Sequence, residues 1–363
     1  MSLNFKKKVS FYIALGSLLV LGFLWILLNG TPFPRWFNPT TQQRIAYLAP
    51  ANSPEVVIHD LVIGETRTLT DTQGQVYDFD VSPDGKFIIY SQSNQMGGRD
   101  LVRINLTTEK KTTLTECGQS VCFEPAISPD GNQVAYTLQD AGQAGKPEVW
   151  VLALNNLSRQ PLFEDPNISS AQARWSPQGD RLAVLDEVEE GIKVITISSG
   201  DIVSIPTGIA KMGAFSPDGS KILFLNTQIN GIQSFQGVFE ANFEDMRIKP
   251  FLAPDLTEFD YSVPAWSPDG NEVVVGWRTL VGLGRGSEQL SLFNAEGLDE
   301  RVITTQQNYT HAAYTWDRNG KRILFQQFEV GNTAAKPQVA IWEETTNSIS
   351  VVAEDASFPR WIP

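Results

Sequence analysis

Histidine and cysteine, the side chains most used in metal and nucleophilic chemistry, are scarce in this chain of 363 residues. It has two histidines, His59 and His311, whereas a catalytic metal site usually needs two or three imidazoles, or a histidine with carboxylates at defined spacing. We expect His59 in a middle strand and His311 near an inner strand of the fold developed below. No G-x-S-x-G, H-E-x-x-H or P-loop motif occurs. The sequence therefore predicts no catalytic residue and no cofactor.

Two stretches resemble ligand-binding loops without matching them. GLGRG at 282–286 departs from the G-x-G-x-x-G spacing and does not open a helix, so we expect a flexible loop there. DFDVSPDG at 78–85 resembles a calcium loop, but its acids do not follow the EF-hand spacing. Bound Ca²⁺ is kept only as a minor alternative, and no small-molecule ligand is expected.

The only cysteines, Cys117 and Cys122, lie in the stretch TECGQSVCFE. In an oxidising compartment, a pair this close bridges the base of a short loop. A redox or metal-binding pair is the functional alternative, although C-x-x-C spacing and a second pair of ligands are both missing. Two free thiols are the third alternative. We predict a structural disulfide.

Aspartates recur in a short motif that is better suited to turns than to catalysis. The motif reads VSPDG at 81–85, ISPDG at 127–131, WSPQG at 175–179, FSPDG at 215–219, WSPDG at 266–270 and WDRNG at 316–320. Proline presets φ, aspartate bonds the backbone two residues on, and glycine takes the left-handed position. An active site is needed once, whereas a turn is needed in every repeat. We therefore assign structural turns to Asp84, Asp130, Asp218 and Asp269.

The intervals between these motifs, 46, 48, 40, 51 and 50 residues, match the length of one four-stranded propeller blade. An apolar strand follows each motif, as at Ile88 and Val134, and two further strands come after it. The residues before the motif supply the strand that opens the unit. The fold class is therefore all-β, with four-stranded antiparallel blades.

The SPDG turn followed by these strands resembles the TolB-type, or WD40-like, β-propeller repeat, over roughly residues 40–363. The resemblance implies a propeller but no single activity, because such propellers occur in periplasmic binding proteins, oligopeptidase gating domains, polysaccharide lyases and accessory parts of membrane assemblies. TolB itself resembles a propeller preceded by an α/β domain, which this sequence lacks. In this chain a linker of about fifteen residues joins the apolar N-terminal run directly to the propeller, which makes a Tol–Pal role doubtful.

The tetrapeptide FPRW occurs twice, at 33–36 and 358–361, and both copies compete for one inner strand. The first unit has strands at 44–49, 55–61 and 66–70 but no SPDG motif. An unclosed propeller keeps unpaired sheet edges. We predict that 356–361 supplies the missing strand, which gives seven blades over 44–363. In the alternative, Phe33–Trp36 fills that place and the C-terminal tail packs elsewhere.

The N-terminal residues differ from the rest of the chain. Lysines at 6–8 precede an apolar run from Phe11 to Leu28, long enough to span a bilayer. We predict a cytoplasmic segment at 1–10, a transmembrane helix at 11–29 and a linker at 30–43, with a cleaved signal peptide as the alternative. The lysines favour the cytoplasmic side, which places the propeller on the periplasmic or extracellular side of the cytoplasmic membrane. The aromatic residues expected at the membrane interface are Trp25, Phe33, Trp36 and Phe37.

Composition and loops point to a protein partner. A net charge of −13 argues against nucleic acid. The long loops of blades five to seven carry a candidate partner-binding rim, namely Phe235, Leu280, Val281, Leu283 and Arg285. Tyr309, His311 and Tyr314 are candidates for the mouth of the central channel. We predict a non-catalytic scaffold that docks on a membrane complex or tethers an envelope component. The alternative is a carbohydrate- or peptide-binding propeller, possibly a lyase or hydrolase.

Overall fold

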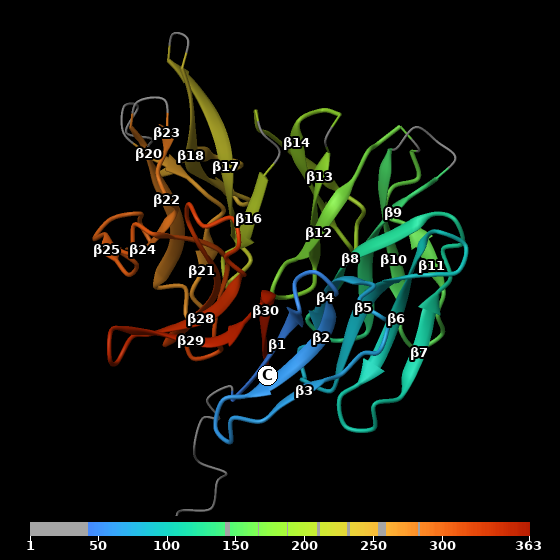
Figure 1. Ribbon diagram of the computed structural model, residues 1–363. Helices are drawn as coiled ribbons and strands as arrows, with labels where there is room; N and C mark the ends of the chain where they lie inside the picture. The colour runs from blue at the N-terminus through green and yellow to red at the C-terminus, as the bar shows by residue number, and fades with distance from the viewer. Residues whose placement is uncertain are drawn as a thin grey trace, which may run out of the picture. The chain divides into compact units, whose positions relative to one another are not determined.

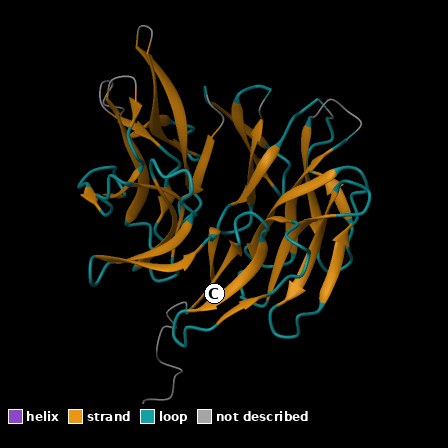
Figure 2. Ribbon diagram, viewed as in Figure 1, coloured by secondary structure: helices purple, strands orange, loops and turns teal. Residues whose placement is uncertain are grey.

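The computed structural model describes residues 43–363, apart from 142–145, 166, 187, 209–210, 231–232, 253–258 and 282–283. Every regular element in this part of the chain is a β-strand (Figure 2). No helix among the described residues is long and apolar enough to cross a membrane. The segments predicted as cytoplasmic N-terminus, transmembrane helix and linker up to residue 42 lie outside the described residues, as do Trp25, Phe33, Trp36 and Phe37.

The strands form antiparallel units of four, numbered here in chain order (Figure 1). Unit 1 contains β1 (Arg44–Ala49), β2 (Glu55–Asp60), β3 (Thr66–Thr68) and β30 (Ser357–Ile362). Unit 2 contains β4 (Val76–Val81), β5 (Phe87–Ser93), β6 (Arg99–Asn105) and β7 (Lys111–Thr115), and unit 3 contains β8 (Val121–Ile127), β9 (Gln133–Gln139), β10 (Pro147–Ala153) and β11 (Arg159–Pro161). One parallel bridge, Arg99–Val121, joins units 2 and 3. Unit 4 contains β12 (Ala171–Trp175), β13 (Arg181–Asp186), β14 (Gly191–Thr196) and β15 (Ile202–Pro206).

The remaining units follow the same order. Unit 5 contains β16 (Lys211–Phe215), β17 (Lys221–Asn230), β18 (Gln233–Asn242) and β19 (Ile248–Leu252). In unit 6 the first strand is split into β20 (Phe259–Tyr261) and β21 (Ala265–Trp266), followed by β22 (Glu272–Val281), β23 (Gly284–Arg285), β24 (Gln289–Asn294) and β25 (Arg301–Val302). Unit 7 contains β26 (Tyr309–Trp316), β27 (Arg322–Glu329), β28 (Gln338–Glu343) and β29 (Ser348–Glu354).

The core lies between the units and not within one of them. Within the described residues, each pair of neighbouring units shares an apolar cluster. One of these clusters joins unit 7 to unit 1, where Leu324 and Val339 pack with Ile45, Tyr47 and Trp361. Because every sheet buries both faces against neighbours, its middle strands are apolar on both sides. The described units therefore follow one another without an uncovered apolar face between the last and the first.

The SPDG turns join the first two strands of their units by a repeated set of hydrogen bonds. In unit 2, the Ser82 hydroxyl donates to Asp84 at 2.9 Å and accepts the Phe87 N–H at 3.0 Å, and Gly85 has a φ of 66°. The serine–aspartate bond recurs in three further turns, where it is the leading cause of a lowered carboxyl pKa, at Asp130, Asp218 and Asp269. The four aspartates therefore stabilise turns through these contacts.

The turns stand beside one another at one end of the units, which we call the turn rim. Gly179 lies against Pro129, Gly270 against Pro217 and Gly320 against Pro268. Gly85, in unit 2, lies against the carbonyl of Pro363. The C-terminal segment therefore occupies, in unit 1, the place that a turn proline holds elsewhere.

The C-terminal copy of FPRW is the inner strand of unit 1. β30 pairs with β1 in antiparallel register, with Ile45 opposite Trp361 and Ala46 opposite Arg360. The Trp361 indole N–H donates to the Thr315 carbonyl of unit 7 at 3.2 Å. Equivalent indole bonds run from Trp175 to Ala126 and from Trp316 to Ala265, at 3.0 and 3.1 Å. In these three units the tryptophan of the motif thus joins neighbouring units, whereas the Trp266 indole N–H has no partner among the described residues. The N-terminal copy lies outside the described residues.

Candidate functional site

The first strands of most neighbouring units contact one another, and we call the first strands the inner strands. Counted from the motif, the position before the large residue is occupied by Arg360 in unit 1, Asp80 in unit 2 and Arg174 in unit 4. Units 3, 5, 6 and 7 have small residues at this position, namely Ala126, Ala214, Ala265 and Thr315. The described inner strands therefore bring two arginines and one aspartate to the same level.

Asp80 is held by the backbone. Its carboxylate accepts the Ile127 N–H of unit 3 at 2.8 Å and the Val81 N–H at 2.9 Å. Burial raises the pKa of Asp80, although these bonds and the charges of Arg360 and Arg174 oppose the rise. The pKa of Arg174 is lowered, mainly by the protein packed around its guanidinium and then by the positive charge of Arg360. Part of the Arg174 side chain still reaches solvent. The positive charges of Arg174 and Arg360 therefore lie near each other, in surroundings that disfavour charge.

A second pair of carboxylates stabilises bulges in the inner strands. Glu124 and Gln172 both have a φ of 53°, which breaks the strand register and turns their N–H groups toward the preceding unit. Asp78 accepts the Glu124 N–H at 2.7 Å, and Glu124 accepts the Gln172 N–H at 3.2 Å. Burial raises the pKa of Asp78 to about 6. Asp78, Asp80 and Asp84 each accept hydrogen bonds from the protein, but Oδ1 of Asp78 has no partner among the described residues.

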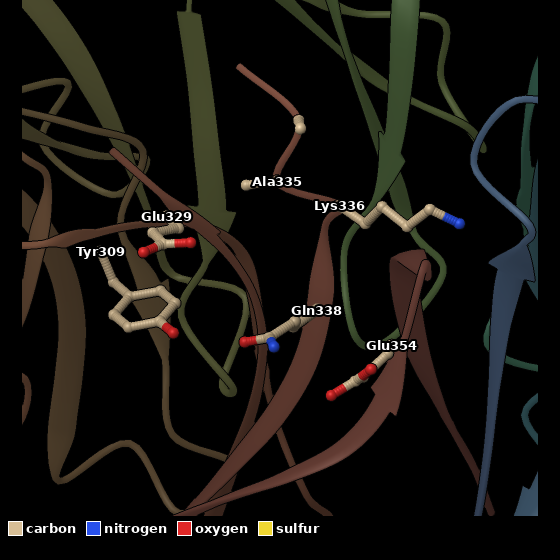
Figure 3. A pocket seen from close by; sticks show the side chains of 7 residues that line it. Tyr309, Glu329, Ala335, Lys336, Gln338 and Glu354 are labelled. Carbon is tan, nitrogen blue, oxygen red and sulfur yellow. The ribbon is translucent and has the colours of Figure 1, made fainter. Parts of the chain in front are cut away.

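A pocket of about 240 Å³ opens at the far end of unit 7 from the turn rim. All four strands of the unit contribute to it: Tyr309 begins β26, Glu329 ends β27, Gln338 begins β28 and Glu354 ends β29 (Figure 3). The connection between β27 and β28 adds Ala334, Ala335 and Lys336. Lys336 forms an ion pair with Asp355, whose other oxygen accepts the Ala51 N–H of unit 1 at 3.1 Å.

Strand register explains why these side chains share one face. Tyr309 lies opposite Glu329, and the next row runs His311–Gln327–Gln338–Glu354 across the four strands. Directly opposite residues, and residues two apart, point to the same side of a sheet. This polar row continues the face on which Phe325 and Trp342 pack against unit 6. Glu329, Gln338 and Glu354 were not predicted from the sequence, because only the register across four strands brings them together.

The predicted channel-mouth residues separate in the structure. Tyr309 lines the pocket, but His311 is 1% exposed, and its Nδ1–H donates to the Glu288 carbonyl 2.7 Å away. Burial lowers the pKa of His311. The Tyr314 hydroxyl accepts the Gly276 N–H at 2.9 Å and contacts the Val263 carbonyl, and burial raises its pKa. Packing between units 6 and 7 therefore encloses His311, which does not reach a channel mouth, whereas Tyr314 is half-buried and its place at the mouth stays a prediction.

The predicted loops of the rim are largely strands. Phe235 lies in β18, Leu280 and Val281 lie in β22, and Arg285 lies in β23, whereas Leu283 lies outside the described residues. The reason is that these stretches pair with themselves: residues 226–230 bond to 233–237, and Leu280 and Val281 pair with Arg285 and Gly284. Both hairpins extend past the ends of their neighbouring strands. We call this end of the units, opposite the turn rim, the hairpin rim.

The two cysteines are joined. A disulfide links Cys117 and Cys122, with the Cα atoms 6.2 Å apart, at the connection between β7 and β8. Asp100 accepts the Cys117 N–H at 2.8 Å, and Asn94 donates to the Gly118 carbonyl at 2.8 Å. The bridge therefore closes a short loop that is also fixed by hydrogen bonds from unit 2.

Four-stranded antiparallel units, packed face to face with their first strands together, define a β-propeller. The sequence pattern of the PD40 family, the TolB beta propeller domain, matches residues 33–239, which is more than half of the chain. The chain belongs to this TolB β-propeller family. Tol-Pal system protein TolB of Wolinella succinogenes is 23% identical over 236 residues, 63% of this chain and 54% of that protein. The chain thus spans about half the length of this curated relative.

Solved structures extend the likeness in fold. TolB of Acinetobacter baumannii superposes with a TM-score of 0.53 at 13% identity, covering 85% of this chain and 79% of that one. Oligogalacturonate lyase of Vibrio parahaemolyticus superposes with a TM-score of 0.60 at 14% identity, covering 87% and 85%. At such low identity the superpositions show the propeller fold alone, and one of the two relatives is an enzyme.

Proposed function

We propose that this protein is a non-catalytic, protein-binding propeller of the cell envelope. In this proposal, residues 11–29 anchor it in the cytoplasmic membrane, and a closed ring of seven blades lies on the periplasmic or extracellular side. The apolar cluster between units 7 and 1 supports closure, and the disulfide supports an oxidising compartment. The name of the Wolinella relative, a Tol-Pal system protein, supports an envelope role.

The projecting hairpin of unit 5 carries the proposal. β17 and β18 pair from Lys221–Asn242 to Asn230–Gln233, but β16 reaches only Leu225 and β19 only Val238. Residues 226–230 and 233–237 therefore extend past both neighbouring strands, at the top of the view in Figure 1. β1 begins at Arg44, beside Ile362 and the turn rim, so the chain enters at the opposite end. A hairpin that leaves its own sheet has surface available for a partner.

A deletion tests this role and keeps the paired strands up to Leu225 and Val238, with the loss of one hydrogen bond from the Gln236 N–H to Asp260. Removing residues 227–236 joins Asn226 to Gly237, and Asn-Gly is the preferred two-residue turn between paired strands such as those ending at Leu225 and Val238. Tagged full-length protein and the deletion variant are purified from gently solubilised native membranes. We expect a stoichiometric partner with the parent protein and its loss with the deletion.

The control replaces an exposed apolar pair at the turn rim. Val62 and Ile63 are 64% and 69% exposed, and the double substitution Val62→Ser with Ile63→Ser should leave capture unchanged. Equal capture by the deletion variant would refute docking through the hairpin. Absence of any stoichiometric partner would refute the protein-binding role itself.

The charged inner strands favour one alternative, an acidic ligand bound near the axis. Arg174 and Arg360 are suited to carboxylates, and oligogalacturonate, the acidic sugar named for the Vibrio relative, is a suitable probe. Incubation with the purified protein, followed by ultraviolet absorbance of unsaturated product, separates lyase activity from the non-catalytic proposal. Product formation that Arg174→Gln abolishes would replace that proposal.

A further inference from the structure

The pocket of unit 7 is rich in negative charge that its own lysine does not neutralise. Glu329 and Glu354 lie at two of its sides, with the Tyr309 hydroxyl and the Gln338 amide between them (Figure 3). The Lys336 side chain runs away from Tyr309 and Glu329 in this view, and its ammonium group pairs with Asp355 outside the lining. Glu329 accepts one hydrogen bond from the Asn332 amide at 2.8 Å, but no ion pair neutralises Glu329 or Glu354 among the described residues.

Buried polar atoms beside the pocket also lack partners. Gln327 is 2% exposed, lies between His311 and Gln338 in the same row, and donates to Gln338 Oε1 at 2.8 Å. Gln327 Oε1 and His311 Nε2 have no hydrogen bond among the described residues, and neither does Gln289 Oε1 of the adjoining unit. Buried polar atoms are normally bonded. These unpaired acceptors lie behind the lining and carry partial negative charge, which favours a positively charged group in the pocket.

Size and lining narrow the class of this positively charged group. The volume corresponds to about eight water molecules at roughly 30 Å³ each, enough for a charged group on a short aliphatic stem. Ala334 and Ala335 offer methyl groups beside the carboxylates, which suits a stem that is apolar next to its charged end. A primary ammonium group has three donors and one positive charge, and the chain's net charge of −13 favours the approach of cations.

We propose that this pocket binds the ammonium group of a lysine side chain presented by a protein partner. The source of the lysine rests on the proposed function, whereas binding of the amine itself does not. Because the pocket lies at the end of β27 and the projecting hairpin at the end of β17, both belong to the hairpin rim. A partner that contacts the hairpin therefore has a lysine-sized pocket two units away on the same side.

The test uses the purified full-length protein in detergent and isothermal titration with Nα-acetyl-L-lysine methylamide. The matched probe is Nα-acetyl-L-norleucine methylamide, which has the same stem without the ammonium group. We expect saturable binding of the lysine probe, with a Kd on the order of 1 mM, weakened by added salt, and none of the norleucine probe. Glu329→Gln and Glu354→Gln should each weaken binding about three- to fivefold, as for exposed charge pairs.

Glu343→Gln is the control, because Glu343 is an exposed carboxylate at the other end of β28. Absence of saturation up to about 10 mM, tenfold above the expected Kd, or equal binding of norleucine, would overturn the inference. The inference would also be overturned if the protein bound maltotriose saturably, lost that binding in Glu354→Gln, and did not bind the lysine probe. If the protein binds the amine but captures no partner, the pocket remains an amine site, and only the assignment of the amine to a partner's lysine is refuted.

Discussion

The pairing of β30 with β1 leads to the sharpest prediction, and Trp361→Ala is the perturbation. Trp361 is 6% exposed, lies between units 7 and 1, carries the Arg322 guanidinium 4.5 Å from its ring and donates to Thr315. Truncating a buried tryptophan to alanine costs about 3–5 kcal/mol, and the lost hydrogen bond adds about 1 kcal/mol. We therefore expect Trp361→Ala to lower the free energy of unfolding by about 4–6 kcal/mol.

Urea denaturation followed by tryptophan fluorescence and circular dichroism measures this loss. Phe358→Ala is the matched control from the same strand, because Phe358 is 53% exposed and should cost less than about 1 kcal/mol. A chain ending at Asp355 loses the whole strand, including Ile362, and with a typical total stability of about 5–15 kcal/mol should show no cooperative transition. Unchanged stability in that truncated chain would falsify the closure, as would equal losses from Trp361→Ala and Phe358→Ala.

Three further predictions concern the turns, the buried carboxylate and the disulfide. Ser216→Ala removes a buried hydroxyl that bonds to Asp218 and to the Lys221 N–H, and it should cost about 1–3 kcal/mol of stability. The control Ser199→Ala, at an exposed serine, should cost under about 0.5 kcal/mol. Equal thermal shifts in the two variants would contradict the stabilising role of the turn serine. In the folded protein the pKa of Asp78 is about 6, above its ordinary 3.8. The protonated carboxyl therefore contributes stability that is complete below pH 3.8 and is lost as pH rises through 6. Asp78→Asn should raise the free energy of unfolding at pH 7.5 by about 1–2 kcal/mol and leave it unchanged near pH 3.5. A destabilising effect at pH 7.5 in urea melts would show that the ionised carboxylate is needed there. Replacing both Cys117 and Cys122 by serine opens a loop with a sequence separation of 5 and should cost about 2 kcal/mol, and melts that do not change on adding a reductant count against that value.

Local sequence was sufficient for the repeat and its turns. The SPDG motif carries its own geometry, since Ser82, Asp84 and Gly85 complete the turn with bonds inside six residues. The place of the C-terminal FPRW was also predictable, because spacing from the large residue sets the register of an inner strand. β30 indeed lies beside β1.

Features that depend on neighbouring units were not predictable in this way. His311 and Tyr314 looked accessible as members of an inner strand, but their exposure is decided by Glu288, Gly276 and other groups of unit 6. The hairpin at 226–237 looked like a loop because it is polar, yet its two halves satisfy each other's backbone. The pocket depends on residues 45 positions apart, from Tyr309 to Glu354, and no local pattern marks it.

The distance along the chain between β1 and β30 has a consequence for synthesis. More than 300 residues separate Ala49 from Ser357, so at about 5–20 residues per second the ribosome needs roughly 15–60 seconds to deliver the second strand after the first. During that interval one edge of β1 has no partner strand, and Ile45 and Tyr47 lack their contact with Trp361. Unpaired edges recruit strands from other chains. Chains released before residue 357 are therefore expected to aggregate, and not to accumulate as folded fragments.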